Sequence, residues 1–91
     1  VDDYALRNCK NLQSVSIGKK TRFIGKKAFY NDAALKDITI RSQSLNTVGS
    51  SAIRNINKKA VIHVPSGKRK AYRKLFTTKT GYTSTMRITT K

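Results

Sequence analysis

Hydrophobic and polar positions along this chain recur with a period of 23 or 24 residues. The stretch 28–49, AFYNDAALKDITIRSQSLNTVG, contains the complete pattern. Moved back by 23 residues, it matches ALRNCKNLQSVSIGKKTRFIG at 5–25, and moved forward by 24 it matches a decayed copy at 52–65. Self-similarity at a period of roughly 20 to 50 residues is typical of stacked repeat folds. We call these three stretches, in chain order, the first, second and third units.

Each unit contains short segments with the periodicity of a β-strand. In the first unit Val15 and Ile17 alternate with polar residues, as in a strand with one buried face. Phe23 and Ile24, followed by Gly25, predict a second short strand, and the second unit repeats both segments. One unit is too small to bury its apolar side alone, so we expect the units to stack on each other.

The pattern changes after Pro65, which ends the third unit before a second strand can form. Ser66 can cap a helix over about 67–76, and alternating residues predict a final strand over about 82–89. Such elements would close the open end of the stack, as repeat arrays require. The expected apolar face of the helix consists of Ala71, Tyr72, Leu75 and Phe76.

We therefore predict a β-rich α/β solenoid, in which short strand units stack as a right-handed coil. Residues 1–65 would form about two and a half repeats, and residues 66–91 a C-terminal cap, together making one compact domain. Because Val1–Ala5 aligns with the middle of the repeat pattern, we expect the chain to be the C-terminal part of a longer protein. The exposed edge of the first unit is then a candidate for self-association.

Composition changes this picture mainly through charge. Twenty Lys and Arg residues stand against four Asp and no Glu, a formal net charge of +16. Such a field attracts polyanions, including nucleic acid, anionic lipid, cell-wall polymer and glycan. One cysteine, Cys9, permits no internal disulfide, and one Cys with one His, His63, cannot form a zinc site. We expect no cofactor and no metal, and no apolar run reaches the ~18 residues of a membrane span.

The repeat pattern A-[LF]-x-N-[CD]-x-x-L-x-x-[VI]-x-I, followed by [IV]-G, resembles the BspA-like leucine-rich repeats of bacterial surface proteins. It reads ALRNCKNLQSVSI and AFYNDAALKDITI in this chain, and the ending NINKKAVIHVPSGKRKAYRKLF resembles the closing segment of such arrays. The resemblance implies leucine-rich-repeat-like units in a secreted or cell-surface bacterial protein that serves adhesion or host-protein binding. One departure is that Asp32 and Ile56 occupy, in later units, the position of Cys9.

Candidate chemical groups are few. No nucleophile, base and oxyanion donor occur together in a recognisable motif, and no Gly-rich phosphate loop is present, so we expect no enzyme. The resemblance implies that Cys9 lies inside the stack as a small hydrophobic residue rather than as a reactive thiol. Asp32 is expected to accept hydrogen bonds from turn amides rather than to act as an acid or metal ligand. His63 should face outward beside Ser16 and Thr39.

Two surfaces are candidates for binding a host or matrix protein or an anionic cell-wall polymer or glycan. The candidate strand-face residues are Gln13, Ser14, Ser16, Lys36, Asp37, Thr39 and His63. The candidate polyanion-binding residues are Lys58, Lys59, Lys68, Arg69, Lys70, Arg73 and Lys74.

A purely structural cap whose charge keeps it in solution is the alternative to binding. Nucleic acid is a weaker alternative, because its binders pair basic patches with exposed aromatic residues or a known motif. No such motif occurs in this chain. The aromatic residues expected at inward positions are Phe23, Phe29, Tyr72 and Phe76.

Overall fold

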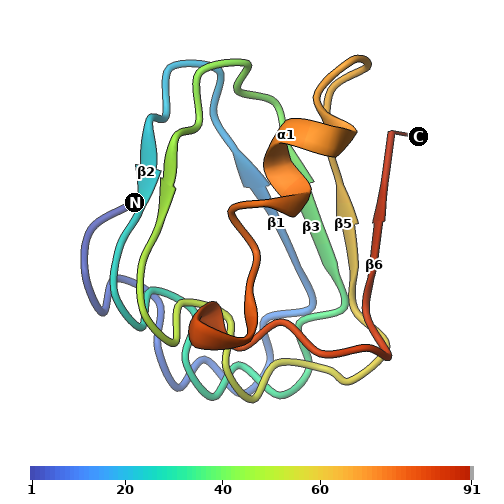
Figure 1. Ribbon diagram of the computed structural model, residues 1–91. Coiled ribbons are helices and arrows are strands. Elements are labelled where there is room, and N and C mark those ends of the chain that lie inside the picture. The colour runs from blue at the N-terminus through green and yellow to red at the C-terminus, as the bar shows by residue number, and fades with distance from the viewer. Residues whose placement is uncertain (91) are drawn as a thin grey trace.

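A computed structural model describes residues 1–90 and contains two small parallel sheets (Figure 1). The four-stranded sheet consists, in spatial order, of β1 (Ser14–Ile17), β3 (Asp37–Ile40), β5 (Val61–His63) and β6 (Arg87–Thr89). The two-stranded sheet consists of β2 (Phe23–Ile24) and β4 (Thr47–Val48). The first and second units therefore each supply one strand to each sheet, and the third unit supplies only β5, as the position of Pro65 predicted.

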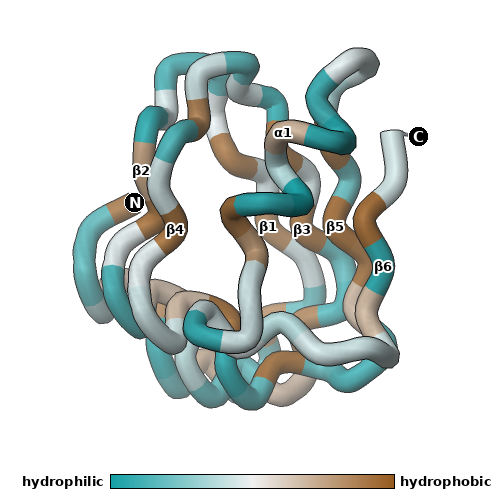
Figure 2. Tube along the Cα trace, in the orientation of Figure 1, coloured by the Kyte–Doolittle hydropathy of each residue, from teal (hydrophilic) through white to brown (hydrophobic). Residues whose placement is uncertain are grey.

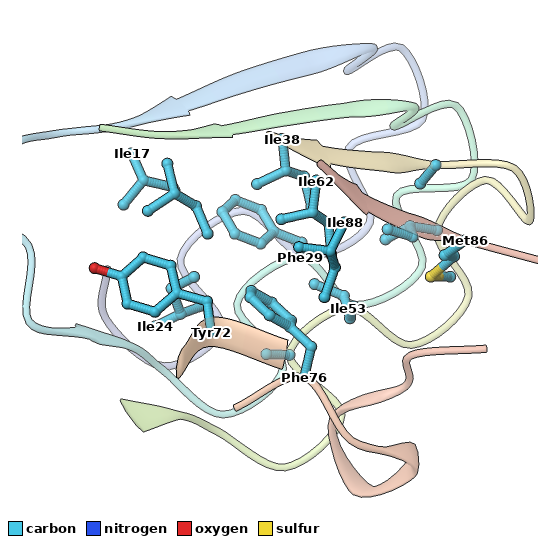
Figure 3. Close-up of a cluster of buried hydrophobic side chains, with 14 of the residues drawn as sticks. Ile17, Ile24, Phe29, Ile38, Ile53, Ile62, Tyr72, Phe76, Met86 and Ile88 are labelled. Atoms are coloured by element: carbon cyan, nitrogen blue, oxygen red, sulfur yellow. The ribbon is translucent and has the colours of Figure 1, made fainter. Parts of the chain in front are cut away.

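The register of the large sheet aligns the apolar positions of successive units. Val15 pairs with Ile38, Ile38 with Ile62, and Ile62 with Ile88. The last three side chains are at most 6% exposed and face Phe29 and other apolar residues of the same core (Figure 3). Burying side chains of this size contributes about 1.5 to 3 kcal/mol each. The core is therefore a continuous column through the stack, as period-two alternation predicted, while Figure 2 shows hydrophilic residues gathered at the turns.

Turns at one end of the units are joined by backbone hydrogen bonds from each unit to the next. The amide of Leu6 donates to the carbonyl of Ala28, and the amide of Phe29 donates to the carbonyl of Ala52. The amide of Ile53 continues the series but donates to Thr80, in the 3-10 helix η1 (Thr78–Thr80). Because η1 supplies carbonyls that a fourth unit would supply, the amides of Ser51 and Ile53 remain paired.

The same turns require left-handed backbone conformations at two repeated positions. Asn8, Asn31 and Asn55 share one of these positions, with φ between 60° and 64°. Asn tolerates this region better than most residues because its short polar side chain can bond locally. In this fold the Nδ2 group of Asn55 donates to the side-chain oxygen of Asn31 in the neighbouring unit at 2.9 Å. The recurring Asn therefore marks a backbone requirement of the repeat. The other position is held by Tyr4, Lys27 and Ser51.

Glycine follows the second strand of the first and second units because two segments of the chain approach closely there. A Cβ at Gly49 would lie 2.5 Å from the amide nitrogen of Lys26, and one at Gly25 would lie 2.5 Å from that of Asp3. Real Cβ atoms do not tolerate such distances to backbone atoms. The [IV]-G of the repeat is thus a packing requirement between neighbouring units.

The C-terminal segment differs from the prediction in its boundaries. The helix α1 spans Arg69–Arg73 rather than 67–76, and its N-cap is Lys68, without a side-chain cap bond, instead of Ser66. The final strand β6 covers three residues rather than 82–89, because a turn at residues 84–85 interrupts the extended chain. The expected apolar face of the helix is reduced to Tyr72 and Phe76, which are buried, and a half-buried Leu75.

Two residues that were predicted to point inward, Phe23 and Ala71, are exposed. Each lies in a short element in which the next residue takes the inward place. Phe23 is 45% exposed because the neighbouring Ile24 takes the inward place in the two-residue strand β2. Ala71 is exposed because its neighbour Tyr72 points into the core. The other large exposed apolar side chains are Tyr4, at 40%, and Leu6, at 38%. All three lie in or next to the first unit.

Candidate binding surfaces

The outward face of the large sheet carries two straight rows of side chains. The register places Ser14, Asp37, Val61 and Arg87 in one row and Ser16, Thr39, His63 and Thr89 in the next. Strand residues two apart point to the same face, so both rows lie on the side opposite the buried isoleucines. The expected outward positions of Ser14, Ser16, Asp37, Thr39 and His63 are consistent with this register.

Gln13 and Lys36, the other two predicted face residues, lie just before β1 and β3 rather than in them. Both are exposed, and the amide of Lys36 donates to the carbonyl of Gln13 at 2.9 Å. They therefore extend the surface at its edge. Sequence reasoning missed Arg87 and Thr89, which continue the rows onto β6. Their alternation was visible in the sequence, but nothing there indicated that β6 pairs next to β5.

His63 and Asp37 form an ion pair on this face when the imidazole is protonated. The Nε2 atom of His63 lies 3.2 Å from Oδ1 of Asp37, across the β3–β5 pair. Both side chains are partly exposed, at 29% and 43%. An exposed pair of this kind contributes little stability, so its main effect is to orient two polar groups on the face.

The basic residues predicted to form one polyanion site separate into two groups. Lys58 and Lys59 lie in the turn that precedes β5, where the Thr85 hydroxyl donates to the Lys58 carbonyl. The others lie on or beside α1, beyond the opposite end of β5 (Figure 1). The second group consists of Lys68, Arg69, Lys70, Arg73 and Lys74.

A surface pocket of about 630 Å³ lies between the second group and the end of the sheet. Arg69 and Arg73 are four residues apart and so share one side of α1, which packs against β6. Arg87 enters the pocket from β6, and none of its lining residues within 1–90 is acidic. Arginines from two separate elements, α1 and β6, therefore line one pocket. The lining residues are Val61, His63, Arg69, Arg73, Tyr82, Met86, Arg87, Ile88 and Thr89.

The positive charge of the surface is not balanced within the described part of the chain. None of the Lys or Arg side chains in residues 1–90 has a carboxylate oxygen within 4.0 Å. One of the four Asp side chains, Asp32, is fully buried, and another, Asp37, faces His63. Because repulsion among unpaired like charges opposes the compact state, an anionic partner would stabilise this surface.

An exposed tyrosine, Tyr4, and a half-buried one, Tyr30, accompany basic residues at the turns. The Arg7 guanidinium lies 4.9 Å from the ring centre of Tyr4, and the Lys27 ammonium lies 5.1 Å from that of Tyr30. Of the four aromatic residues expected at inward positions, Phe29, Tyr72 and Phe76 are buried and Phe23 is exposed. The expectation did not include Tyr4 or Tyr30.

Asp32 has the structural role that the sequence indicated. Its Oδ1 accepts a hydrogen bond from the Cys9 amide of the preceding unit at 2.6 Å. Oδ2 is buried without a hydrogen-bond partner, and desolvation raises the pKa of this carboxyl group, with the Cys9 hydrogen bond opposing the rise. The side chain thus joins two units and is closed to solvent, which excludes direct contact with a surface ligand. Cys9 is half-buried, and its thiol contacts the carbonyl of Arg7 at 3.8 Å.

Searches of the described residues find neither a metal site nor a membrane-spanning helix. Across residues 1–90, no three His, Cys, Asp or Glu side chains are grouped so that they could hold a metal ion. In the same part of the chain, no helix is long and apolar enough to cross a membrane.

Comparison with known proteins identifies the family. Residues 1–89 match the family described as BspA type leucine rich repeat region (6 copies). The chain belongs to this family, as the repeat pattern predicted. No curated protein and no solved structure gives a significant match. Leucine-rich repeats of this kind form solenoids, generally act as non-catalytic protein-interaction modules and are typically found in bacterial surface proteins.

Proposed function

We propose that this chain is a non-catalytic recognition module of a secreted or cell-surface bacterial protein. It binds a host or matrix protein, or an anionic wall polymer or glycan, through the outward strand face and the basic surface. The observation that carries the proposal is the large sheet, which presents two outward rows, polar at every position except Val61, over four strands in continuous register. A rigid polar face of this kind can position contacts for a partner without rearranging.

The uncompensated charge supports an electrostatic contribution to binding. The lysines and arginines without carboxylate partners would speed encounter with an anionic partner and make the affinity dependent on salt. The strand face and the charged surface meet at Arg87, which belongs to both. One partner can therefore contact the two surfaces together.

A structural role is the second candidate, and specific contacts favour it. The carbonyl of Thr80 and the strand β6 take the places of a fourth unit, and the Tyr72 hydroxyl bonds the backbone of the second unit. We propose on this basis that residues 66–91 act as a cap on the repeats of 1–65, within one domain. A cap and a binding face can coexist, so the two roles need a functional test.

Binding can be tested by biolayer interferometry on purified matrix proteins, isolated bacterial cell wall and heparin. We expect binding to at least one of these at about 50 mM salt and weaker binding at about 500 mM, where exposed charges are screened. A variant with Ser16→Glu and Thr39→Glu changes the strand face alone, because both side chains point away from the core. Absence of binding by the wild type to every surface at low salt would leave the cap as the sole role.

Self-association through the first unit remains a prediction. β1 is the edge strand of the large sheet, and the exposed Tyr4, Leu6 and Phe23 lie in or beside the unit that contains it. Sedimentation velocity over a concentration series would measure it directly. We expect Leu6→Glu to reduce any dimer that forms by this edge.

A further inference from the structure

We propose that the pocket lined by Arg69, Arg73 and Arg87 binds a short segment of an acidic polysaccharide. The proposal deepens the proposed function by naming one ligand class and one site for it, and it rests on that function being recognition. The site is distinct from the predicted cluster of lysines, because Lys58 and Lys59 lie at the other end of β5 and Arg87 was not in that cluster.

The chemistry of the pocket favours oxyanions. Each guanidinium presents donors in a fork that matches carboxylate or sulfate oxygens two at a time. The three arginines line one pocket whose lining has no acidic residue, and no carboxylate within residues 1–90 lies within 4.0 Å of them. His63 also lines the pocket, but its Nε2 lies 3.2 Å from Oδ1 of Asp37, so the three arginines supply the donors. A ligand that places two or more anionic groups within the pocket would meet most of these donors.

The non-ionic lining favours a sugar chain over an isolated anion. Tyr82 is half-buried at the pocket wall, and its hydroxyl is held by the carbonyl of Met86 at 3.2 Å, which orients the ring. An oriented ring of this kind can pack against the apolar face of a sugar. The pocket volume of about 630 Å³ lies within the range of sites for small organic ligands. Outside the pocket, Lys70 on α1 and Lys74 at its C-cap continue the positive surface for a polymer.

The strand edge beside the pocket argues against an acidic peptide that adds to the sheet. The residues flanking Ile88 direct backbone bonds to β5, since the Arg87 amide donates to Ala60 and the Thr89 carbonyl accepts from Val64. The backbone of Ile88 therefore faces the free edge of β6. That residue is only 6% exposed, so an extended peptide cannot reach the groups with which it would pair.

Nucleic acid fits the pocket less well. Proteins that bind single strands stack successive bases on several aromatic rings. Tyr82 is the one Phe, Tyr or Trp among the described lining residues, and Tyr4 and Tyr30 do not line this pocket. The pocket can hold charged groups and one ring face, which matches a glycan better than a series of bases.

The test is titration calorimetry of the full chain with a heparin hexasaccharide at several salt concentrations. The pocket variant carries Arg69→Gln, Arg73→Gln and Arg87→Gln, and the control variant, which removes the same charge elsewhere, carries Lys19→Gln, Lys20→Gln and Arg22→Gln. We expect at least about a tenfold loss of affinity in the pocket variant and less than about threefold in the control. The slope of log affinity against log salt should fall by about two in the pocket variant. Circular dichroism and denaturation verify that both variants fold.

A second variant isolates the geometry from the charge. Arg69→Lys, Arg73→Lys and Arg87→Lys together keep the net charge but lose the guanidinium forks, and we expect an intermediate loss of affinity. Equal losses in the pocket and control variants would overturn the proposed site while leaving recognition by charge intact. Tighter binding of polyglutamate or single-stranded DNA than of heparin, at matched charge, would overturn the ligand class. Absence of heparin binding by the wild type would overturn this site, whereas binding to a matrix protein would still support the proposed function.

Discussion

The hydroxyl of Tyr72 links the C-terminal segment to the second unit through two hydrogen bonds. It donates to the carbonyl of Ser42 at 2.6 Å and accepts from the amide of Leu45 at 3.3 Å. The side chain is 2% exposed, and its ring lies in the core beside Ile24 and Phe76 (Figure 3). We predict that Tyr72→Phe, which removes only the hydroxyl, will destabilise the whole domain rather than its C-terminal end alone.

The magnitude follows from the two buried backbone groups that lose their partner. Each hydrogen bond contributes about 1 kcal/mol net, and a buried group left unpaired carries a penalty of about 1 to 3 kcal/mol. Because the contact at 3.3 Å is long and contributes less, we expect a total loss of about 2 to 3 kcal/mol. In a domain of this size each 1 kcal/mol shifts Tm by about 4 to 8 °C, so Tm should fall by about 10 to 20 °C.

Urea denaturation followed by circular dichroism measures this loss, with Tyr82→Phe as the matched control. The Tyr82 hydroxyl makes one bond, to the Met86 carbonyl at 3.2 Å, on a half-buried residue that water can reach. Its removal should lower stability by less than about 1 kcal/mol. If the two variants agree within about 0.5 kcal/mol, with unchanged m values, the inferred role of the Tyr72 hydroxyl is wrong.

Three further predictions test other contacts of the stack. Burial raises the pKa of Asp32, so the folded state disfavours its charged form and loses stability as pH rises from about 3.8 through the folded pKa. Asp32→Asn keeps the Oδ1 acceptor and has no charge to bury, so it should gain stability relative to wild type over that pH range. Denaturation at several pH values measures this difference. Gly49→Ala places a Cβ 2.5 Å from the Lys26 nitrogen and should lower stability by about 1 to 3 kcal/mol in thermal denaturation. Phe29 is 1% exposed, and Phe29→Ala should lower the free energy of unfolding by about 3 to 5 kcal/mol. Leu6 holds the same repeat position but is 38% exposed, so Leu6→Ala should lower it by less than about 1 kcal/mol.

Each of these predictions has an outcome that contradicts it. A stability difference between Asp32→Asn and wild type that does not change with pH would show that this carboxyl group titrates alike in the folded and unfolded states. A neutral Gly49→Ala would mean that the neighbouring units separate at little cost. Equal effects of Phe29→Ala and Leu6→Ala would mean that the first unit is covered in solution, for instance by a second copy of the chain.

The repeat and its buried positions could be predicted because they depend on local periodicity. Alternation at Val15 and Ile17 and the matching residues 23 positions later identified β1 and β3, and Pro65 correctly marked the end of the third unit. Predictions failed where an element is too short for periodicity to decide. In β2 the choice between Phe23 and Ile24 for the inward place depends on the neighbouring unit rather than on the segment itself.

The sequence predicted several residues of the candidate site but not how they are arranged in space. The outward strand residues follow from alternation, and the basic character of the C-terminal segment follows from composition. The separation of Lys59 from Arg69 could not be read from a sequence in which they lie ten residues apart. The meeting of Arg69 with Arg87 depends on β6 pairing with β5, which is a long-range contact.

The amino-acid sequence by itself therefore determined the period, the family, the alternating core and the excess of positive charge. Each of these is a property of residue order and residue type. The repeat makes the pattern easier to recognise, because every unit has the same local requirement. Only the tertiary structure decided which charges converge. The buried Tyr72 and Phe76 hold α1 against the stack, and β6 takes the edge next to β5. Arg69 and Arg73 of α1 therefore line one pocket with Arg87 of β6. The physical reason is that packing of the inward side chains orients the outward ones.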